Sequence, residues 1–281
     1  MSSTIKLALC QMKVSDDKYS NIDRAVKMLE KSSKNGVDIA ILPEMFNCPY
    51  DNTKFRSYAE DVQNGETIKS ISKAAKECGV HVIAGSIPEI YEDKLYNTCV
   101  VIDDNGHVIG RHRKLHLFDI CIPGKIEFRE SDTLSSGDNI TVVDTRFCKI
   151  GIAICYDVRF PEIFRLMAQK GAQIIAVPAA FNMTTGPLHW EMLMRARAVD
   201  NQVFVAAVSP GRDENANYVA YGNSIIVDPF AEILGRLGAE EGILYKEIDI
   251  SKLTKIRDEL PLIKHIREDI YEVYEKSRFN K

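Results

Sequence analysis

Features that would direct a protein to a membrane, to a nucleic acid or to export are missing from this sequence. No apolar segment approaches the roughly 20 residues of a membrane-spanning helix, and no signal peptide precedes the first strand-like run. The 40 acidic and 36 basic residues are scattered and give a net charge of −4, so no polyanion-binding face is predicted. These absences predict a cytoplasmic protein that binds neither a membrane nor a nucleic acid.

Cysteine occurs seven times, but without the spacing of a disulfide framework or a zinc site. The number is odd, and no two cysteines form a Cys-x-x-Cys pair. The six histidines are also dispersed, although His112 and His116 lie on either side of Lys114. This distribution argues against disulfide bonds and against a bound metal.

A Pro-, Gly- or Ser-rich linker and an internal repeat are also lacking, so the 281 residues predict one domain, residues 1–281. The C-terminal arm, residues 251–281, is charged and helical in pattern. Its apolar positions are Leu260, Leu262, Ile263, Ile266, Ile270, Tyr271 and Tyr274. Because a solvated segment needs no such residues, we expect this arm to pack against another surface.

A thiol lies between a predicted strand and a predicted helix. Residues 149–154 form an apolar, β-branched run of strand length, and Phe160-Pro161-Glu162 opens a segment with helical spacing. Cys155 therefore falls on the turn between them. Proline suits the first turn of a helix, whose free N–H groups lower the pKa of a nearby thiol, so Cys155 is a candidate nucleophile. The alternative is a buried cysteine that fills an apolar gap.

Glu44 directly follows another apolar run, residues 38–42. A carboxylate in this position lies at the carboxyl end of a strand, where open α/β sheets place their chemistry. Its alternative role is a helix-cap or surface charge. Other predicted elements are strands over 5–14, 80–86, 172–178, 202–209 and 242–249, two strands within 221–235, and helices over 21–34, 67–79 and 188–201.

Lys114 follows a predicted hairpin whose strands surround Asp104-Asn105-Gly106. This hairpin interrupts the alternation of strands and helices, which predicts an α/β fold with a mixed sheet. A lone lysine in such a position is more often a surface residue whose stem lies along apolar side chains. Residues 119–138 have little periodicity and are predicted to form a long loop, either functional or disordered, that contains Glu130.

Three segments resemble the sequence boxes of the nitrilase, or carbon–nitrogen hydrolase, superfamily. They occur in the family's order: Ile41-Leu42-Pro43-Glu44, Arg113-Lys114-Leu115-His116-Leu117 and Gly151 to Glu162. Segments 123–131, 181–191 and 195–202 are similar to the omega-amidase branch of this superfamily. The resemblance implies a four-layer α-β-β-α sandwich that forms a homodimer.

An amide hydrolase needs a nucleophile, a proton shuttle and positive charge where the oxyanion develops. Cys155, Glu44 and Lys114 supply these roles, with a thioester on Cys155 as intermediate. The backbone N–H of Tyr156 would complete the oxyanion hole with Lys114. Glu130 matches the family's second glutamate, and we assign it to positioning Lys114 and the thiol. No cofactor and no metal is required.

The predicted substrate is a small ω-amide of a dicarboxylic acid, such as 2-oxoglutaramate or 2-oxosuccinamate. In the related carbamoylase branch an arginine at the position of Arg159 holds the substrate carboxylate, so Arg159 is the candidate anchor; a salt bridge to Glu162 or Asp157 is its alternative. The predicted pocket walls, for which core or loop packing is equally open, are Tyr50, Phe118, Phe181, Thr184 and Trp190.

Two other functions stay open. One is another amidase of the superfamily, with the same catalytic residues but a carbamoyl amine, a deaminated peptide or a nitrile as substrate. The other is a catalytically idle interaction module, or a thiol redox sensor that uses Cys155. The intact catalytic set argues against the second.

Overall fold

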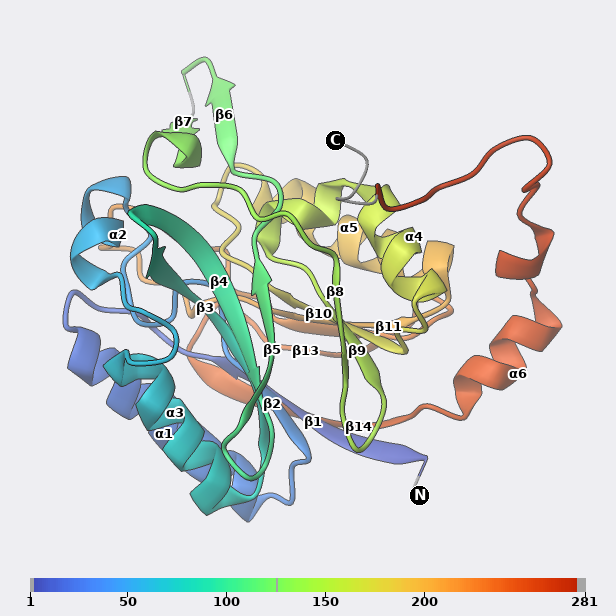
Figure 1. Cartoon of the computed structure of the whole chain (residues 1–281), viewed down its shortest axis with the longest axis horizontal. Coiled ribbons are helices and arrows are strands. Elements are labelled where there is room, and N and C mark those ends of the chain that lie inside the picture. Colours follow the sequence, from blue (N-terminus) through green and yellow to red (C-terminus); the bar gives the residue numbers. More distant parts are fainter. Residues whose placement is uncertain (1–2, 125, 277–281) are drawn as a thin grey trace.

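Two six-stranded sheets form the centre of the computed structural model, which describes residues 3–124 and 126–276 (Figure 1). The first sheet contains β1 (Thr4–Gln11), β2 (Ile39–Ile41), β3 (His81–Tyr91), β4 (Lys94–Ile102), β5 (Val108–Arg113) and β14 (Gly242–Asp249). The second contains β8 (Thr141–Asp144), β9 (Lys149–Ile152), β10 (Ile174–Pro178), β11 (Phe204–Val208), β12 (Ile225–Val227) and β13 (Ile233–Arg236).

Both sheets are mixed, as the hairpin pattern predicted. Their strand orders are β14-β1-β2-β3-β4-β5 and β13-β12-β11-β10-β9-β8. The inner pairs β1 with β2, β2 with β3, β9 with β10 and β10 with β11 are parallel, and the outer pairs are antiparallel. The carboxyl ends of β2 and β9, after which Glu44 and Cys155 come, therefore belong to parallel inner strands.

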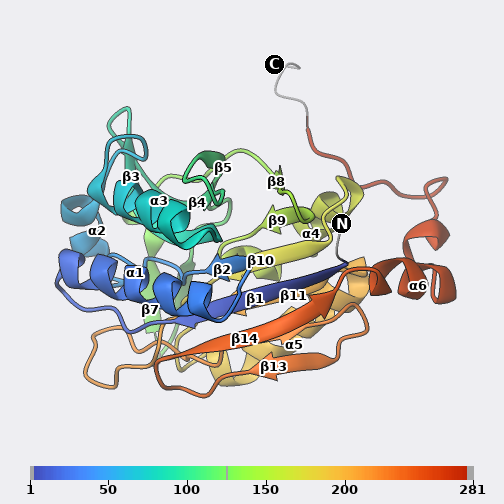
Figure 2. The same ribbon diagram turned by 90° about the horizontal axis from the view of Figure 1, so that it is seen from below.

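Helices cover the outer faces of both sheets. They are α1 (Lys18–Lys34), α3 (Glu66–Cys78), α4 (Pro161–Gln169) and α5 (Gly186–Asn201). α2 (Asn52–Tyr58) lies at one end of the molecule, and α6 (Lys252–Glu259) belongs to the C-terminal arm at the other end (Figure 1). Figure 2 shows α1 and α3 side by side along one sheet, whereas α4 and α5 lie on the opposite side of the molecule. The predicted α-β-β-α arrangement is confirmed.

The alternation of side chains in β1 shows how the layers are held together. Leu7 and Leu9 belong to the core that also contains residues of the second sheet, while Ala8 and Cys10 pack with apolar residues of α1 and α3. Successive residues of a strand point to opposite faces, so the apolar stretch from Leu7 to Cys10 serves both interfaces. Gly79, with a φ of 65°, ends α3 in the left-handed conformation that glycine favours.

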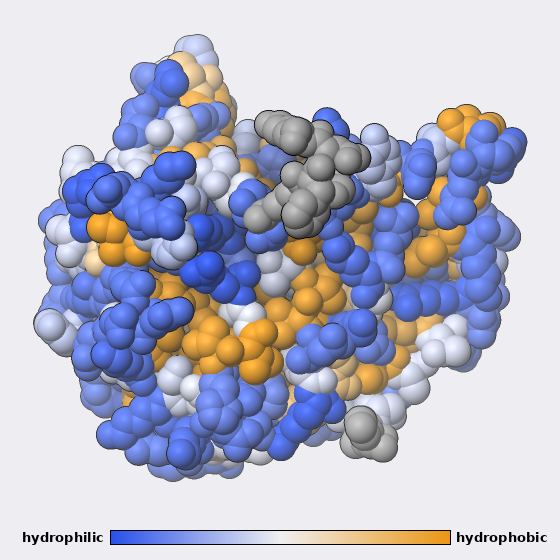
Figure 3. Space-filling view, in the orientation of Figure 1, coloured by the Kyte–Doolittle hydropathy of each residue, from blue (hydrophilic) through white to orange (hydrophobic). Residues whose placement is uncertain are grey.

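The prediction of a long loop over residues 119–138 is wrong in part. This stretch contains a hairpin of β6 (Asp119–Ile122) and β7 (Ile126–Arg129), followed by the 3-10 turn η1 (Glu130–Asp132). Each strand has four residues, too few for an alternating pattern to stand out from the sequence. The hairpin projects from the body of the molecule (Figures 1 and 3).

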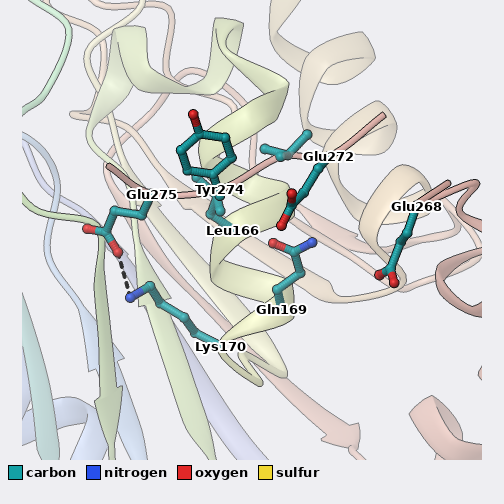
Figure 4. A pocket seen from close by; sticks show the side chains of 8 residues that line it. Leu166, Gln169, Lys170, Glu268, Glu272, Tyr274 and Glu275 are labelled. Carbon is teal, nitrogen blue, oxygen red and sulfur yellow. Dashed lines mark ion pairs between the residues drawn. The ribbon is translucent and has the colours of Figure 1, made fainter. Parts of the chain in front are cut away.

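The C-terminal arm is less helical than its sequence predicts. After α6 only one 3-10 turn follows, η3 (Ile263–His265), and residues 277–281 lie outside the described part of the chain. Residues 268–275 return to α4, where Glu275 pairs with Lys170 at 2.7 Å beside a cavity of about 550 Å³ (Figure 4). Leu260, Ile270 and Tyr274 stay exposed. No described helix is both long and apolar enough to cross a membrane.

Candidate active site

Four predicted catalytic residues meet where strands of the two six-stranded sheets and of the β6–β7 hairpin end. Glu44 follows β2, Lys114 follows β5, Cys155 begins the 3-10 turn η2 (Cys155–Arg159) after β9, and Glu130 follows β7. At most 4% of any of these residues is exposed to solvent. The structure thus brings residues separated by more than 100 positions into one water-poor site.

Two carboxylates hold the ammonium group of Lys114. Its Nζ lies 2.9 Å from Glu44 Oε1 and 2.8 Å from Glu130 Oε2, and it also donates to Tyr50 Oη at 3.3 Å. Burial opposes the charge, but Glu130 and Glu44 outweigh burial and raise the pKa of Lys114. Lys114 therefore stays protonated at neutral pH, as a donor to an oxyanion must.

Burial raises the pKa of Glu44, Lys114 opposes this effect, and the negative charge of Glu130 adds to it. Glu44 Oε1 accepts hydrogen bonds from Lys114 and from Asn97 Nδ2, at 2.9 and 2.8 Å. Oε2 makes no hydrogen bond of normal length with any described residue. A carboxylate with one fixed and one free oxygen, and with raised basicity, is suited to accept a thiol proton.

Cys155 differs from the prediction in its ionisation. Burial, followed by the Glu44 carboxylate, raises the pKa of the thiol well above its usual value, while Lys114 and the backbone N–H of Ala180 oppose this shift. The helix that was expected to lower the pKa, α4, begins only at Pro161, because η2 lies between it and Cys155. The resting thiol is therefore protonated, so attack requires a base.

Two residues of the site adopt the left-handed backbone conformation. Cys155 has a φ of 47° and Met45, which follows Glu44, has a φ of 51°. Residues other than glycine rarely adopt such angles unless the surrounding structure holds them there. Backbone strain thus occurs at the nucleophile and directly after the proton acceptor, the two residues whose side chains must be oriented toward the substrate.

Sequence reasoning missed the residues that support this cluster. Asn97 in β4 donates from Nδ2 to Glu44 Oε1 at 2.8 Å and to Glu130 Oε1 at 3.3 Å. A buried asparagine within the apolar run of β4 was the available signal. Tyr218, whose ring lies 4.6 Å from that of Tyr50, had no such signal because its loop shows no pattern.

Two glycines allow backbone segments to approach the site closely. A Cβ at Gly85 would lie 2.0 Å from Pro43 O, and one at Gly137 would lie 2.2 Å from Arg113 O. Both carbonyls belong to the residue directly before a site residue, Glu44 or Lys114. Any larger side chain at either position would displace a catalytic segment.

A cavity of about 440 Å³ reaches this cluster. Glu44, Met45, Tyr50, Ala180 and Tyr218 line its inner part, and Lys54, Asp213 and Asn215 are among its other lining residues. Tyr50 is the only one of the predicted pocket walls that lines it in the described structure. The volume suffices for a small organic acid amide.

The other predicted contact residues do not line this cavity in the described structure. Phe118 and Tyr156 pack edge to face, with ring centroids 5.3 Å apart, and the Arg159 guanidinium lies 5.5 Å from the ring of Tyr156 and 5.1 Å from that of Phe181. Thr184 only continues a turn, since its N–H donates to Asn182 Oδ1.

Trp190 is a core residue and not a pocket wall. It is 1% exposed, packs against Phe181 and donates to the Asn223 carbonyl at 2.7 Å. In α5 it occupies the face that packs against the sheet. A large aromatic residue near a predicted loop could not be assigned to core or pocket from the sequence, because only the packing of α5 decides its direction.

The chain is similar to known proteins over nearly its whole length. Residues 6–258 match the carbon–nitrogen hydrolase family model. The mouse protein named omega-amidase NIT2 is 51% identical over 274 residues, which are 98% of this chain and 99% of the mouse chain; the human protein is 48% identical over 271 residues, 96% and 98% of the two chains. The crystal structure of Saccharomyces cerevisiae Nit3, a member of branch 10 of the nitrilase superfamily, is 40% identical, with a TM-score of 0.87 over 94% of this chain and 97% of that one. This chain belongs to the carbon–nitrogen hydrolase family.

Proposed function

We propose that this protein hydrolyses a small ω-amide of a dicarboxylic acid, of the 2-oxoglutaramate or 2-oxosuccinamate kind, to the acid and ammonia. The buried cluster of Cys155, Glu44, Lys114 and Glu130 beside the cavity carries the proposal, because it contains every group that amide cleavage needs. The names of the mouse and human relatives support the choice of substrate.

The first half of the reaction forms a thioester. Glu44 takes the thiol proton while the Cys155 sulfur attacks the amide carbon, and the carbonyl oxygen becomes an oxyanion. Lys114 and the N–H of Tyr156 stabilise that negative charge. Glu44 then gives its proton to the nitrogen, the carbon–nitrogen bond breaks, and ammonia leaves.

The second half returns the enzyme to its resting state. Glu44 takes a proton from water, whose oxygen attacks the thioester carbon, and the carbon–sulfur bond breaks as the thiol regains the proton. Glu130 keeps Lys114 in place in both halves, since its Oε2 also accepts from the backbone N–H of Phe118 at 2.7 Å. Glu130 thereby links Lys114 to the base of the β6–β7 hairpin.

A panel of amides, followed by ammonia release, tests the proposal. It contains 2-oxoglutaramate, 2-oxosuccinamate, a neutral short amide, a carbamoyl amine, a deaminated peptide and a nitrile. The highest kcat/KM is expected for the two acidic ω-amides. A preference for one of the last three compounds would replace the substrate, and no turnover of any compound would leave the idle module or the redox sensor as the function.

Arg159 is the proposed anchor of the substrate carboxylate. Its Nη1 lies 3.2 Å from His189 Nδ1, its Nε is buried without a hydrogen-bond partner, and no described carboxylate forms an ion pair with it. A guanidinium next to the nucleophile's turn that is not neutralised by the protein can bind a carboxylate through two charge-assisted hydrogen bonds.

Arg159→Lys is expected to lower kcat/KM for acidic ω-amides and to spare neutral amides. The expected loss of transition-state stabilisation for the acidic amides is about 1.5–3 kcal/mol. The variant keeps the positive charge but loses the planar pair of donors. Steady-state kinetics on one acidic and one neutral amide, together with the melting temperature, measure the effect. Equal losses on both amides with a lower melting temperature would mean that Arg159 only braces the turn.

The homodimer is also a proposal. Helix α5 is apolar on two faces: Trp190 and Met194 are buried, whereas Leu188 and Met192 are 69% and 58% exposed. Phe230 is 55% exposed, and the next residue, Ala231, accepts a hydrogen bond from Arg195 of α5. An exposed apolar face of this kind typically marks an interface, and a second copy of the chain would cover it.

Sedimentation at micromolar concentration is expected to give twice the 31.7 kDa mass of the chain. Met192→Glu should shift the protein toward the monomer, because it places a charge in the apolar face. Exposed Tyr19 on α1 offers a control, and Tyr19→Glu should leave the mass unchanged. A wild-type protein that sediments only as a monomer would contradict the proposal.

We further propose that residues 1–281 fold as one domain and that the protein acts in the cytoplasm. The match of residues 6–258 to a single family model supports the first of these. One cooperative unfolding transition and a cytoplasmic distribution of the tagged chain are the expected results.

A further inference from the structure

One buried carboxylate contacts both the segment that carries Cys155 and the segment that carries Lys114. Asp157 is fully buried, two residues after the nucleophile. Its Oδ2 accepts from the Ile154 N–H at 3.0 Å, and its Oδ1 accepts from the His116 N–H at 2.9 Å. The amidase mechanism described above does not use this group.

Asp157 closes the turn on which the nucleophile sits. Its backbone N–H donates to the Ile154 carbonyl at 3.0 Å, so side chain and backbone together bind both polar groups of the residue before Cys155. This arrangement holds Cys155 at its φ of 47°. Because a residue with that φ needs support from its surroundings, the carboxylate stabilises a conformation that the chain would otherwise leave.

Two histidines connect the same carboxylate to the Lys114 segment. His116 Nδ1 lies 2.8 Å from Asp157 Oδ1, and His112 Nε2 lies 3.5 Å from Oδ2. A carboxylate only accepts hydrogen bonds, so Nδ1 of His116 carries the proton. These histidines are the residues two positions before and two positions after Lys114. Among the described residues no group of His, Cys, Asp and Glu is arranged as a metal site, so a metal does not explain them.

Further contacts fix the histidines themselves. The ring of His116 stacks on Phe160 at 3.6 Å, and His112 Nδ1 lies 3.1 Å from Thr141 Oγ1. Burial alone would raise the pKa of Asp157, but the nearby His112 ring, the His116 ring and the Ile154 N–H more than offset it and keep the pKa well below its usual range. Asp157 is therefore an ionised acceptor at neutral pH.

We infer that Asp157 is a positioning residue for amide hydrolysis: through His112 and His116 it fixes the Cys155 turn relative to Lys114. This inference rests on the proposed function. Lys114 must lie next to the oxygen of a carbonyl that is bonded to the Cys155 sulfur, and a displacement of about 1 Å can cost roughly 100-fold in rate. Glu44 and Glu130 fix the ammonium end of Lys114, whereas Asp157 fixes the turn that it must face.

Asp157→Asn is the central test, because asparagine keeps the shape and one acceptor but loses the negative charge. We expect kcat for the best ω-amide to fall at least tenfold while KM stays within about twofold, since Asp157 does not touch the substrate. Asp104→Asn is the matched control: it removes the carboxylate 3.8 Å from another buried histidine, His81, outside the site. It should change the melting temperature but not kcat.

A second pair of variants shows whether the carboxylate acts through His116. In His116→Asn the side-chain amide can replace Nδ1 as donor to Asp157, whereas His116→Ala cannot; both lose the stacking on Phe160. We expect His116→Asn to keep most of the activity and His116→Ala to match the loss in Asp157→Asn. The double variant of Asp157→Asn with His116→Ala should be no worse than the more damaging single variant.

Three outcomes would overturn the inference while the proposed function stands. They are wild-type kcat in Asp157→Asn, a kcat loss in Asp157→Asn that Asp104→Asn reproduces at the same fall in melting temperature, or equal activity of His116→Asn and His116→Ala. A wild-type enzyme that releases no ammonia from any amide would instead overturn the proposed function itself.

Discussion

Cys155→Ala is expected to abolish amide turnover and to leave the protein folded. The change removes the only atom that can form the thioester, so no slower version of the same mechanism remains. The thiol is 4% exposed, and replacing it with a methyl group costs a modest packing term. Ammonia release measures the loss, and circular dichroism with the melting temperature measures the fold.

Cys148→Ala is the matched control. Cys148 is also buried, at 7% exposure, and belongs to the same apolar core as Cys155, but it lies at the other end of β9. Its loss removes a similar volume far from Glu44 and Lys114. Full activity of both variants would show that the Cys155 thiol is structural and that the thioester mechanism is wrong.

The pattern of the sequence made Glu44 and Cys155 candidates because each follows an apolar run. Such runs are typical of inner strands, and the carboxyl ends of parallel inner strands lie along one edge. β2 and β9 meet this condition, in different sheets that pack face to face. Lys114 was harder to predict, since it follows the antiparallel strand β5, and the family resemblance selected it.

The ionisation of the thiol could not be predicted from local sequence. A helix N-terminus close in sequence suggested a thiolate, but burial and the Glu44 carboxylate, 111 positions away, dominate the pKa of Cys155. Both causes depend on how the two sheets pack. The same holds for Asn97 and Asp157, whose polar side chains acquire their roles only from groups on other strands.

The roles of His112 and His116 could not be predicted from the sequence either. Their spacing around Lys114 was visible in the sequence, and it suggested at most a metal site, which was rejected. Their common partner is Asp157, 41 positions after His116, and no periodicity connects the two. The spacing of the two histidines thus gained a meaning only from the fold, which places the Asp157 carboxylate next to both of them.

Glu44→Gln is expected to lower kcat by roughly 100- to 10,000-fold, the range that a general acid–base residue supplies. The amide oxygen of glutamine can take the place of Oε1 and keep the hydrogen bonds from Lys114 and Asn97, while its NH2 group occupies the position of Oε2, which has no partner of its own. The fold should therefore survive. Glu89→Gln is the control, since Glu89 is a buried glutamate whose carboxylate binds Arg111 and Arg113 outside the cavity.

Intact-protein mass spectrometry of Glu44→Gln with a good ω-amide distinguishes the two steps that Glu44 serves. The raised pKa of the Cys155 thiol means that the sulfur cannot attack until a base removes its proton. If Glu44 is that base, acylation itself is slow and the mass of the variant stays that of the free enzyme. A stable increase by the mass of the acyl group on Cys155 would show that the thiol reaches the amide without Glu44, and it would restrict Glu44 to activating water in the second half of the reaction.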